Sequence, residues 1–392
     1  MSADDAPSEF VSRRVQNLPA SGIRRFFDLA GSMDDVISLG VGEPDFDTPR
    51  QLTEAAIRSL NEGHTHYTSN YGLLELRRGV SAHLDRLYGV HYDPASEIVI
   101  TAGVSEGLLL AAHSVLDPGD ELLCAEPSFV AYMPCVTLAG GAFVPVPTEE
   151  ESGFLVRAAD LEDGVTSRTK AILLSYPNNP TGAAMARDDL LPIADLAARR
   201  NLLVISDEIY DRMTYGFEHT CFASLPGMRE RTILLGGFSK SFAMTGWRVG
   251  WACAPAGILE AMMQVHQYII MSAPTPSQYA AIEALRSGED DVQAMLREYD
   301  RRRRLIVNGF NGLGLTCIEP RGAFYAFPSI RSTGLSDEEF AEQLLREEKV
   351  VVVPGSAFGA CGAGHVRACY AAPYGQIEEA LARIGRFVHK HR

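Results

Sequence analysis

The sequence predicts an α/β fold in which a large domain, built on a seven-stranded and mostly parallel sheet, is joined to a smaller α+β domain. Short apolar runs alternate with amphipathic helical patterns over residues 97–255, as is typical of parallel α/β units. Longer helical patterns mixed with a few strand-like runs follow toward the C-terminus. The 392 residues exceed what one hydrophobic core usually serves, so two domains are expected.

Seven runs in the first part are expected to be strands, because each is short and apolar and is followed by turn residues. In chain order they are residues 97–101, 121–124, 142–146, 171–174, 202–205, 232–235 and 249–253. Helical patterns lie between several of them, for example at 106–116 and 188–200. The large domain is therefore expected to span residues 47–286.

The remaining residues predict the smaller domain. Helical patterns cover 287–309 and 337–349, and strand-like runs lie at 322–327, 350–353 and 365–370. Four consecutive arginines, residues 301–304, fall on a helical pattern at 292–308, where they are expected to form a solvated face.

Bulk properties exclude several classes of protein. The formal net charge of −15 disfavours a nucleic-acid-binding surface, which needs an excess of Lys and Arg. No apolar run approaches the ~20 residues of a membrane span. The first residues lack the basic and apolar regions of a secretory signal, and seven cysteines without a C-x-x-C pair fit a reducing compartment, so a cytoplasmic protein is expected. His64 and His66 have no further ligand at metal-binding spacing, and no metal is expected.

The candidate chemistry centres on Lys240, which follows the apolar run 232–235. A lysine at the end of a buried strand can form an imine with a carbonyl compound. Arg248 stands eight residues later, where its guanidinium can bind a phosphate dianion. Together the two residues indicate pyridoxal 5′-phosphate (PLP).

Other polar residues follow strand-like runs, at the sheet edge where ligands of open α/β sheets bind. Gly103, Val104 and Ser105 open a helical pattern, so that backbone N–H groups and the Ser105 hydroxyl can hold a phosphate. Asp207 can keep a pyridine nitrogen protonated, and Tyr210, three residues later, can donate to the phenolic oxygen of the cofactor.

Several segments together closely resemble the class I aminotransferases of PLP fold type I, over residues 40–384. They are Ser-Tyr-Pro-Asn-Asn-Pro-Thr-Gly (175–182), Ser-Asp-Glu-Ile-Tyr (206–210) and Gly-Gly-Phe-Ser-Lys-Ser-Phe-Ala-Met-Thr-Gly-Trp-Arg (236–248). Within that class the chain looks most like the gamma subgroup, which includes archaeal-type aromatic and some aspartate aminotransferases. The resemblance implies that residues 1–46 pack with residues 287–392 to form the small domain.

The resemblance also implies roles for single residues. Asn179 contacts the phenolic oxygen of PLP and the substrate, and Phe129 stacks on the pyridine ring. Arg367 binds the substrate α-carboxylate as a bidentate fork, assisted by the backbone of Gly42. Tyr67 reaches the phosphate in the neighbouring subunit, which implies a homodimer. In one departure from the pattern, Gly237 stands where many relatives carry a phosphate-binding serine.

The expected activity is the transfer of an amino group from an L-amino acid to a 2-oxo acid such as 2-oxoglutarate, through a Schiff base between Lys240 and PLP, with Asp207 and Tyr210 as further catalytic residues. An aromatic or bulky apolar donor is favoured, and aspartate or alanine remains a competitor. A PLP-dependent C–S β-lyase uses the same residue set. A non-catalytic PLP-sensing domain is the third hypothesis. Such regulators carry an N-terminal DNA-binding segment, and the residues before Gly40, about 40 in number, are too few for it.

Overall fold

The computed structural model describes residues 10–16, 18, 31 and 33–391. Its large part is built on a sheet of seven strands, as predicted. The strands are β2 (Ile98–Thr101), β3 (Glu121–Glu126), β4 (Ala142–Pro147), β5 (Thr169–Leu174), β6 (Leu203–Asp207), β7 (Thr232–Gly237) and β8 (Gly250–Cys253). Their order is β2-β8-β7-β6-β5-β3-β4, and only β8 runs antiparallel to its neighbours.

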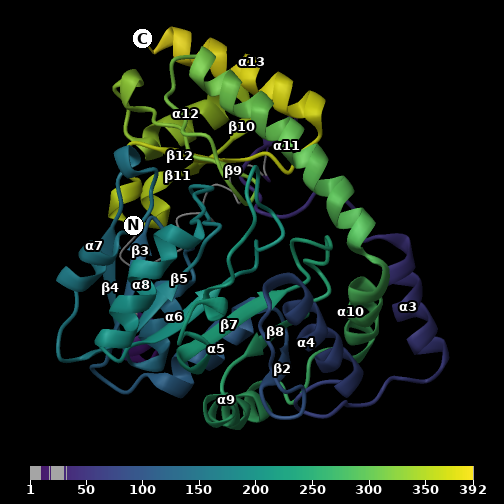
Figure 1. Ribbon diagram of the computed structural model, residues 1–392. Coiled ribbons are helices and arrows are strands. Elements are labelled where there is room, and N and C mark those ends of the chain that lie inside the picture. Colours follow the sequence, from purple (N-terminus) through teal and green to yellow (C-terminus); the bar gives the residue numbers. More distant parts are fainter. Residues whose placement is uncertain (1–9, 17, 19–30, 32, 392) are drawn as a thin grey trace.

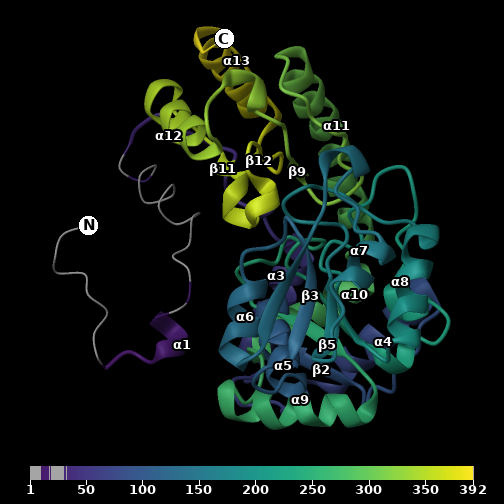
Figure 2. The same cartoon turned by 90° about the vertical axis from the view of Figure 1, so that its left-hand side faces the viewer.

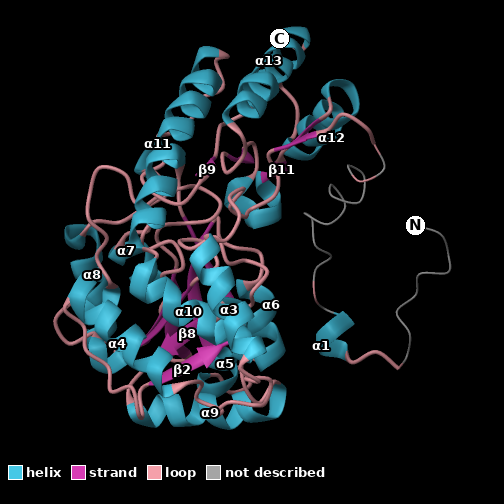
Figure 3. Ribbon diagram, turned by 90° about the vertical axis from the view of Figure 1, so that its right-hand side faces the viewer, coloured by secondary structure: helices cyan, strands magenta, loops and turns pink. Residues whose placement is uncertain are grey.

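The central strands are buried on both faces, which explains their nearly continuous apolar sequences. Leu123 and Ile172 point into one apolar cluster, whereas Leu122 and Ala171 point into another across the sheet. Helices enclose the sheet in all three views (Figures 1, 2 and 3). They are α3 (Arg50–Asn61), α4 (Leu74–Tyr88), α5 (Val104–Val115), α6 (Tyr132–Ala139), α7 (Ala158–Asp163), α8 (Arg187–Arg199), α9 (Ala256–Ile269) and α10 (Thr275–Ser287).

The C-terminal elements form a separate cluster above the sheet, with its own apolar core (Figure 1). Its helices are α11 (Glu289–Gly312), α12 (Asp337–Glu348) and α13 (Tyr374–Lys390). The short strands β9 (Tyr325–Ala326), β11 (Val353–Pro354) and β12 (Val366–Cys369) form one small sheet. A second small sheet pairs β1 (Ile37–Ser38) with β10 (Val350–Val351) in parallel.

Two of the strands predicted for this part differ from the observed ones. The run 350–353 does not form one strand, because Val350 and Val351 pair with β1 whereas Val353 pairs with Arg367 of β12. Of the run 322–327 only Tyr325 and Ala326 are in a strand. The short helix α1 (Arg13–Gln16) precedes β1, but most of residues 1–32 lie outside the described part of the chain, so the predicted packing of residues 1–46 is followed only from residue 33 on.

The prediction of a solvated face for residues 301–304 was wrong for two of the four arginines. Arg302 and Arg303 are only 5% and 7% exposed. Nη1 of Arg302 lies 2.7 Å from Oδ1 of Asp45, which belongs to the N-terminal segment. Nη2 of Arg303 lies 2.6 Å from Oδ1 of Asp300. Pairing with an opposite charge offsets part of the free energy that burial of a guanidinium costs. Among the described residues, no helix combines the length and the apolar character needed to cross a membrane.

Candidate active site

A cavity of about 570 Å³ opens at the carboxyl ends of β6 and β7, between the sheet and the C-terminal cluster. Ten of the twelve residues predicted for the site line it. They are Gly42, Val104, Ser105, Phe129, Asn179, Asp207, Tyr210, Lys240, Arg248 and Arg367. Strands far apart in the sequence therefore bring these side chains to one place, as expected for an open α/β sheet.

Lys240 follows β7 by three residues and points across the cavity to the N-terminal segment. Its Nζ donates a hydrogen bond to the carbonyl oxygen of Gly42 at 2.5 Å. The rings of Tyr210 and Phe324 lie 5.8 and 5.5 Å from the same nitrogen. Burial lowers the pKa of Lys240 to about 8, and the charges of Arg367 and Arg248 act in the same direction. A lysine with this pKa is about one-tenth neutral at pH 7, far more than an ordinary lysine, and the neutral amine is the form that a nucleophile or proton carrier needs.

Asp207 ends β6 and is only 4% exposed. Burial raises its pKa to about 6, while hydrogen bonds oppose this shift: Tyr132 Oη donates to its Oδ2 at 2.8 Å and the Ile209 N–H donates to its Oδ1 at 3.2 Å. A carboxylate of this kind is suited to face a cationic N–H group, because the opposite charge would compensate for the lost hydration.

The turn between β2 and α5 forms the corner of the cavity that holds Arg248. Gly103 has φ +84°, and a Cβ placed on it would lie 2.8 Å from Nη2 of Arg248, so the glycine is required both for its backbone conformation and for its small size. Arg248 donates from Nη2 to the carbonyl of Ala102 at 3.1 Å and from Nη1 to that of Thr245 at 2.9 Å. The N-terminus of α5 and a guanidinium therefore converge, which is a typical setting for a phosphate group.

Arg367, on β12, forms the other end of the cavity. It donates from Nη1 to Oδ1 of Asn179 at 2.8 Å and from Nη2 to the carbonyl of Gly40 at 2.6 Å. Its Nε is buried and has no hydrogen-bond partner among the described residues. Gly42 leaves no room for a side chain here, because a Cβ would lie 2.6 Å from Oη of Tyr325.

Two tyrosines of this cavity were not predicted from the sequence. Tyr132 holds Asp207, and its position three residues after Phe129 was an available signal. Tyr325 lies with its hydroxyl 2.7 Å from that of Tyr210, and the Arg367 guanidinium lies 4.6 Å from the centre of its ring. Nothing in the local sequence indicates that contact, because the two hydroxyls come from segments 115 residues apart.

Two predicted residues do not line the cavity of their own chain. Gly103 lies against Arg248, which does line the cavity. Tyr67 is 79% exposed. No cluster of three or more potential metal ligands occurs among the described residues, and the ring of His64 stacks on that of Tyr279 at 4.7 Å.

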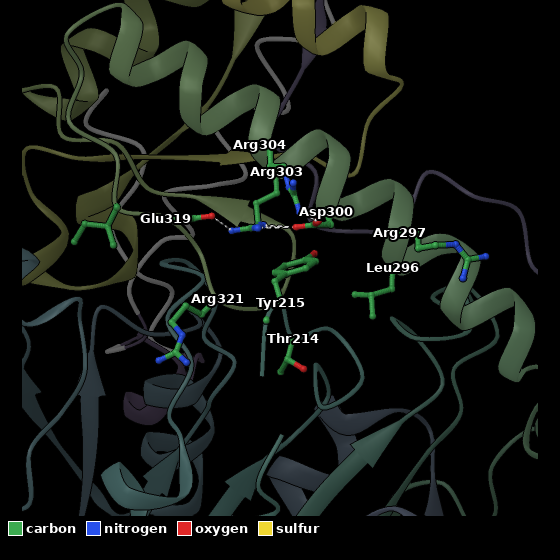
Figure 4. Close-up of a pocket in the computed structure, with 11 residues that line it drawn as sticks. Thr214, Tyr215, Leu296, Arg297, Asp300, Arg303, Arg304, Glu319 and Arg321 are labelled. Carbon is green, nitrogen blue, oxygen red and sulfur yellow. Dashed lines mark hydrogen bonds and ion pairs between the residues drawn. The ribbon is translucent and has the colours of Figure 1, made fainter. Parts of the chain in front are cut away.

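A second cavity, of about 650 Å³, lies beside α11 (Figure 4). Four arginines line it, but they do not converge on one point. Figure 4 shows Arg303 between Glu319 and Asp300, whereas Arg297 and Arg321 point in different directions. Arg304 is paired with Asp300 at 2.6 Å. We therefore assign no ligand to this cavity.

Comparison with known proteins shows the family of the chain. Residues 34–384 match the family model for aminotransferase class I and II. The chain belongs to this aminotransferase family. It is 45% identical to the aromatic-amino-acid aminotransferase 2 of Thermococcus litoralis and to an aspartate aminotransferase of Pyrococcus abyssi, over 97% of this chain and 99% of each relative. The crystal structure of an aromatic aminotransferase from Pyrococcus horikoshii superimposes with a TM-score of 0.90 at 45% identity, covering 94% of this chain and 99% of that one.

The aminotransferase is a PLP-dependent enzyme that moves an amino group from an amino acid to a 2-oxo acid, as predicted. The residues of its cavity fit the cofactor. They include a buried lysine with a lowered pKa, a carboxylate that could face the ring nitrogen, and a helix N-terminus with an arginine that could hold the phosphate. The comparisons do not favour the hypothesis of a C–S β-lyase.

Proposed function

We propose that this aminotransferase takes its amino group from an aromatic or bulky apolar L-amino acid and passes it to a 2-oxo acid such as 2-oxoglutarate. The observation that supports this donor class is the charge of the cavity. Among the described residues that line it, only Lys240, Arg248 and Arg367 are cationic. Each is already needed for the cofactor or the α-carboxylate, which leaves no cation for the distal carboxylate of aspartate.

The rest of the lining supports the same donor. Val41, Ile209 and the ring of Phe129 supply apolar surface, and Glu43 adds a negative charge. The same lack of a further cation applies to the distal carboxylate of 2-oxoglutarate, which has to use neutral donors of the lining or groups from a second subunit. The relative named as an aspartate aminotransferase is as similar as the aromatic one, so aspartate and alanine are the competitors that the assay has to include.

In this proposal PLP, when bound, supplies an electron sink for the bond at Cα. The chain supplies the rest. Arg367 grips the α-carboxylate as a bidentate fork, helped by Asn179, and so fixes which Cα bond faces the ring. Lys240, as a free neutral amine, takes the proton from Cα at its Nζ and returns it on the cofactor side. Asp207 holds the charge of the ring nitrogen, and Tyr210 donates to the phenolic oxygen.

A spectroscopic experiment tests the proposal. The purified protein with PLP is mixed in turn with phenylalanine, tyrosine, aspartate and alanine, and then with 2-oxoglutarate. We expect the visible band of the cofactor to disappear fastest with an aromatic amino acid and to return with the 2-oxo acid, and we expect Lys240→Ala to abolish both steps. A fastest response to aspartate would overturn the donor assignment, and a band that no 2-oxo acid restores would contradict amino-group transfer.

We further propose a homodimer in the cytoplasm, with Tyr67 completing the phosphate site of the partner subunit. Tyr67, Tyr268 and Met271 are 79%, 86% and 46% exposed, which is unusual for large apolar side chains. Their segments are tied together, since Oγ1 of Thr275 donates to the carbonyl of His66 at 2.8 Å.

The proposed division of the chain into domains is residues 47–286 for the large domain and residues 1–46 with 287–392 for the small one.

A further inference from the structure

Glu106 is a buried glutamate directly behind the turn that is proposed to hold the phosphate. It lies in the first turn of α5 and is 8% exposed. Its Oε2 accepts a hydrogen bond from the backbone N–H of Ala102 at 2.5 Å. Its Oε1 lies 2.7 Å from Nδ1 of His266, on α9, whose side chain is fully buried. Two separate elements therefore hold one carboxylate in place.

The backbone of Ala102 is held on both sides of its Cα. Its N–H donates to Glu106, and its carbonyl accepts from Nη2 of Arg248 at 3.1 Å. The next residue is Gly103, which packs against the same guanidinium. The two hydrogen bonds are made by successive peptide groups, Thr101–Ala102 and Ala102–Gly103. The backbone conformation at Ala102 therefore couples Glu106 to Arg248 and to the start of α5.

Helix capping alone does not explain the arrangement. A glutamate at the third helical position often bonds to a backbone N–H just before the helix, which accounts for the contact with Ala102. It does not account for His266, whose Nε2 is buried without a hydrogen-bond partner in the described part of the chain. An imidazole buried for a single contact is costly, and a carboxylate near a phosphate site adds unfavourable charge unless it is held in a polar pair.

We propose that Glu106 and His266 are positioning residues that act through the backbone of Ala102 and set the affinity of the enzyme for the phosphate group of PLP. His266 fixes the carboxylate of Glu106, Glu106 fixes the N–H side of Ala102, and the carbonyl of Ala102 fixes Arg248. The inference rests on the proposed phosphate role of Gly103, Ser105 and Arg248.

The test compares two ligands of the apoenzyme: PLP, and pyridoxal, which is the same molecule without the phosphate. Dissociation constants are measured by absorbance for the wild type, Glu106→Ala and His266→Asn. We expect Glu106→Ala to weaken PLP binding about tenfold or more, because Ala102 loses its acceptor, and to change pyridoxal binding less than about twofold. We expect a smaller loss of the same kind for His266→Asn. If the alanine variant does not fold, His266→Asn carries the test alone. Glu106→Gln, which keeps an acceptor for Ala102 and preserves the shape, should retain most of the affinity for PLP.

His219→Asn is the matched control. His219 is paired with Glu208 at 2.7 Å, and the two side chains are 7% and 5% exposed, so the substitution removes an equally buried pair away from the phosphate turn. It is expected to lower the urea midpoint of unfolding, as His266→Asn does, while the ratio of PLP to pyridoxal affinity stays unchanged. Equal losses for both ligands in a folded Glu106 variant, or an unchanged affinity for PLP, would overturn the inference. If the wild type itself bound PLP no better than pyridoxal, the phosphate assignment would fail first, and the inference with it.

Discussion

Burial shifts the two central titratable groups toward their neutral forms. The pKa of Asp207 rises to about 6 and that of Lys240 falls to about 8, in each case chiefly through burial. Burial therefore makes the charged form of Asp207 less favourable than in an exposed aspartate, and a cationic ring nitrogen would supply the missing countercharge. The neutral form of Lys240 is the one that reacts with a carbonyl group.

The raised pKa of Asp207 predicts a pH-dependent affinity for the ring of the cofactor. Below about pH 6 the carboxyl is protonated and cannot pair with a ring N–H⁺, so the affinity should rise as the pH increases through about 6. Pyridoxal is the suitable ligand, because it has no phosphate that titrates in the same range. Binding is measured between pH 5 and 7.5. Asp207→Asn should remove the step near pH 6 and keep only the rise toward pH 8 that comes from deprotonation of Lys240, and a flat profile for the wild type would contradict the pairing.

Tyr132→Phe should move that step to higher pH. The substitution removes the hydroxyl that donates to Asp207 at 2.8 Å, and with it a contact that favours the ionised carboxylate. One hydrogen bond of about 1 kcal/mol corresponds to a shift of the step by up to about one pH unit. The control is Tyr176→Phe, which deletes an equally buried hydroxyl bonded to the carbonyl of Phe154 at 3.1 Å. A step that moved equally in both variants would show that Tyr132 has no specific effect on Asp207.

At the scale of single elements, the turn before α5 depends on Gly103. Its φ of +84° is strained for any residue with a Cβ, and the new atom would displace Arg248. Gly103→Ala should therefore cost about 1 kcal/mol of unfolding free energy and also weaken PLP binding. Gly119→Ala is the matched control, because Gly119 has φ +95° and no atom within 4 Å of an added Cβ. Urea unfolding and PLP titration should show a similar loss of stability in both variants and a loss of affinity only in the first.

Some strands could be predicted from the sequence and others could not. The strands of the large sheet were predictable to within about two residues, because each is an apolar run closed by turn residues. The division of the run 350–353 between two sheets was not, since it depends on pairing Val350 with Ile37, far away in the sequence. In the same way Lys240 was found from its own neighbours, whereas Tyr132 and Tyr325 gain their roles from hydroxyl contacts that only the folded chain creates.

At the scale of the whole molecule, the cavity is assembled from both parts of the chain. Arg367 reaches Asn179 at 2.8 Å, and Tyr325 reaches Tyr210 at 2.7 Å, so the C-terminal cluster supplies one wall and the sheet the other. Tyr67 is the exception, because it belongs to the large part but points to solvent. In the proposed dimer this exposure is removed when Tyr67 enters the site of the partner subunit.

Subunit exchange tests whether Tyr67 acts across the dimer. Lys240→Ala should be inactive, and Tyr67→Ala should be weak at limiting PLP, because losing one hydrogen bond to a charged phosphate costs about tenfold or more in affinity. A hybrid of the two variants contains one site with its own Lys240 and with the partner subunit's Tyr67. Mixed and re-associated subunits should therefore be more active at limiting PLP than the two variants assayed separately.

The control hybrid combines Lys240→Ala with Arg367→Ala. Both side chains line the cavity of the same chain, so each site of this hybrid still lacks one of them and no activity should return. If the Tyr67 hybrid regained nothing although sedimentation showed that mixed dimers had formed, Tyr67 would act within its own subunit or not at all. If both hybrids regained activity, exchange of the small domain between subunits would be the simpler explanation. Recovery confined to the Tyr67 hybrid requires a site made by two chains, because no rearrangement within one chain restores both residues.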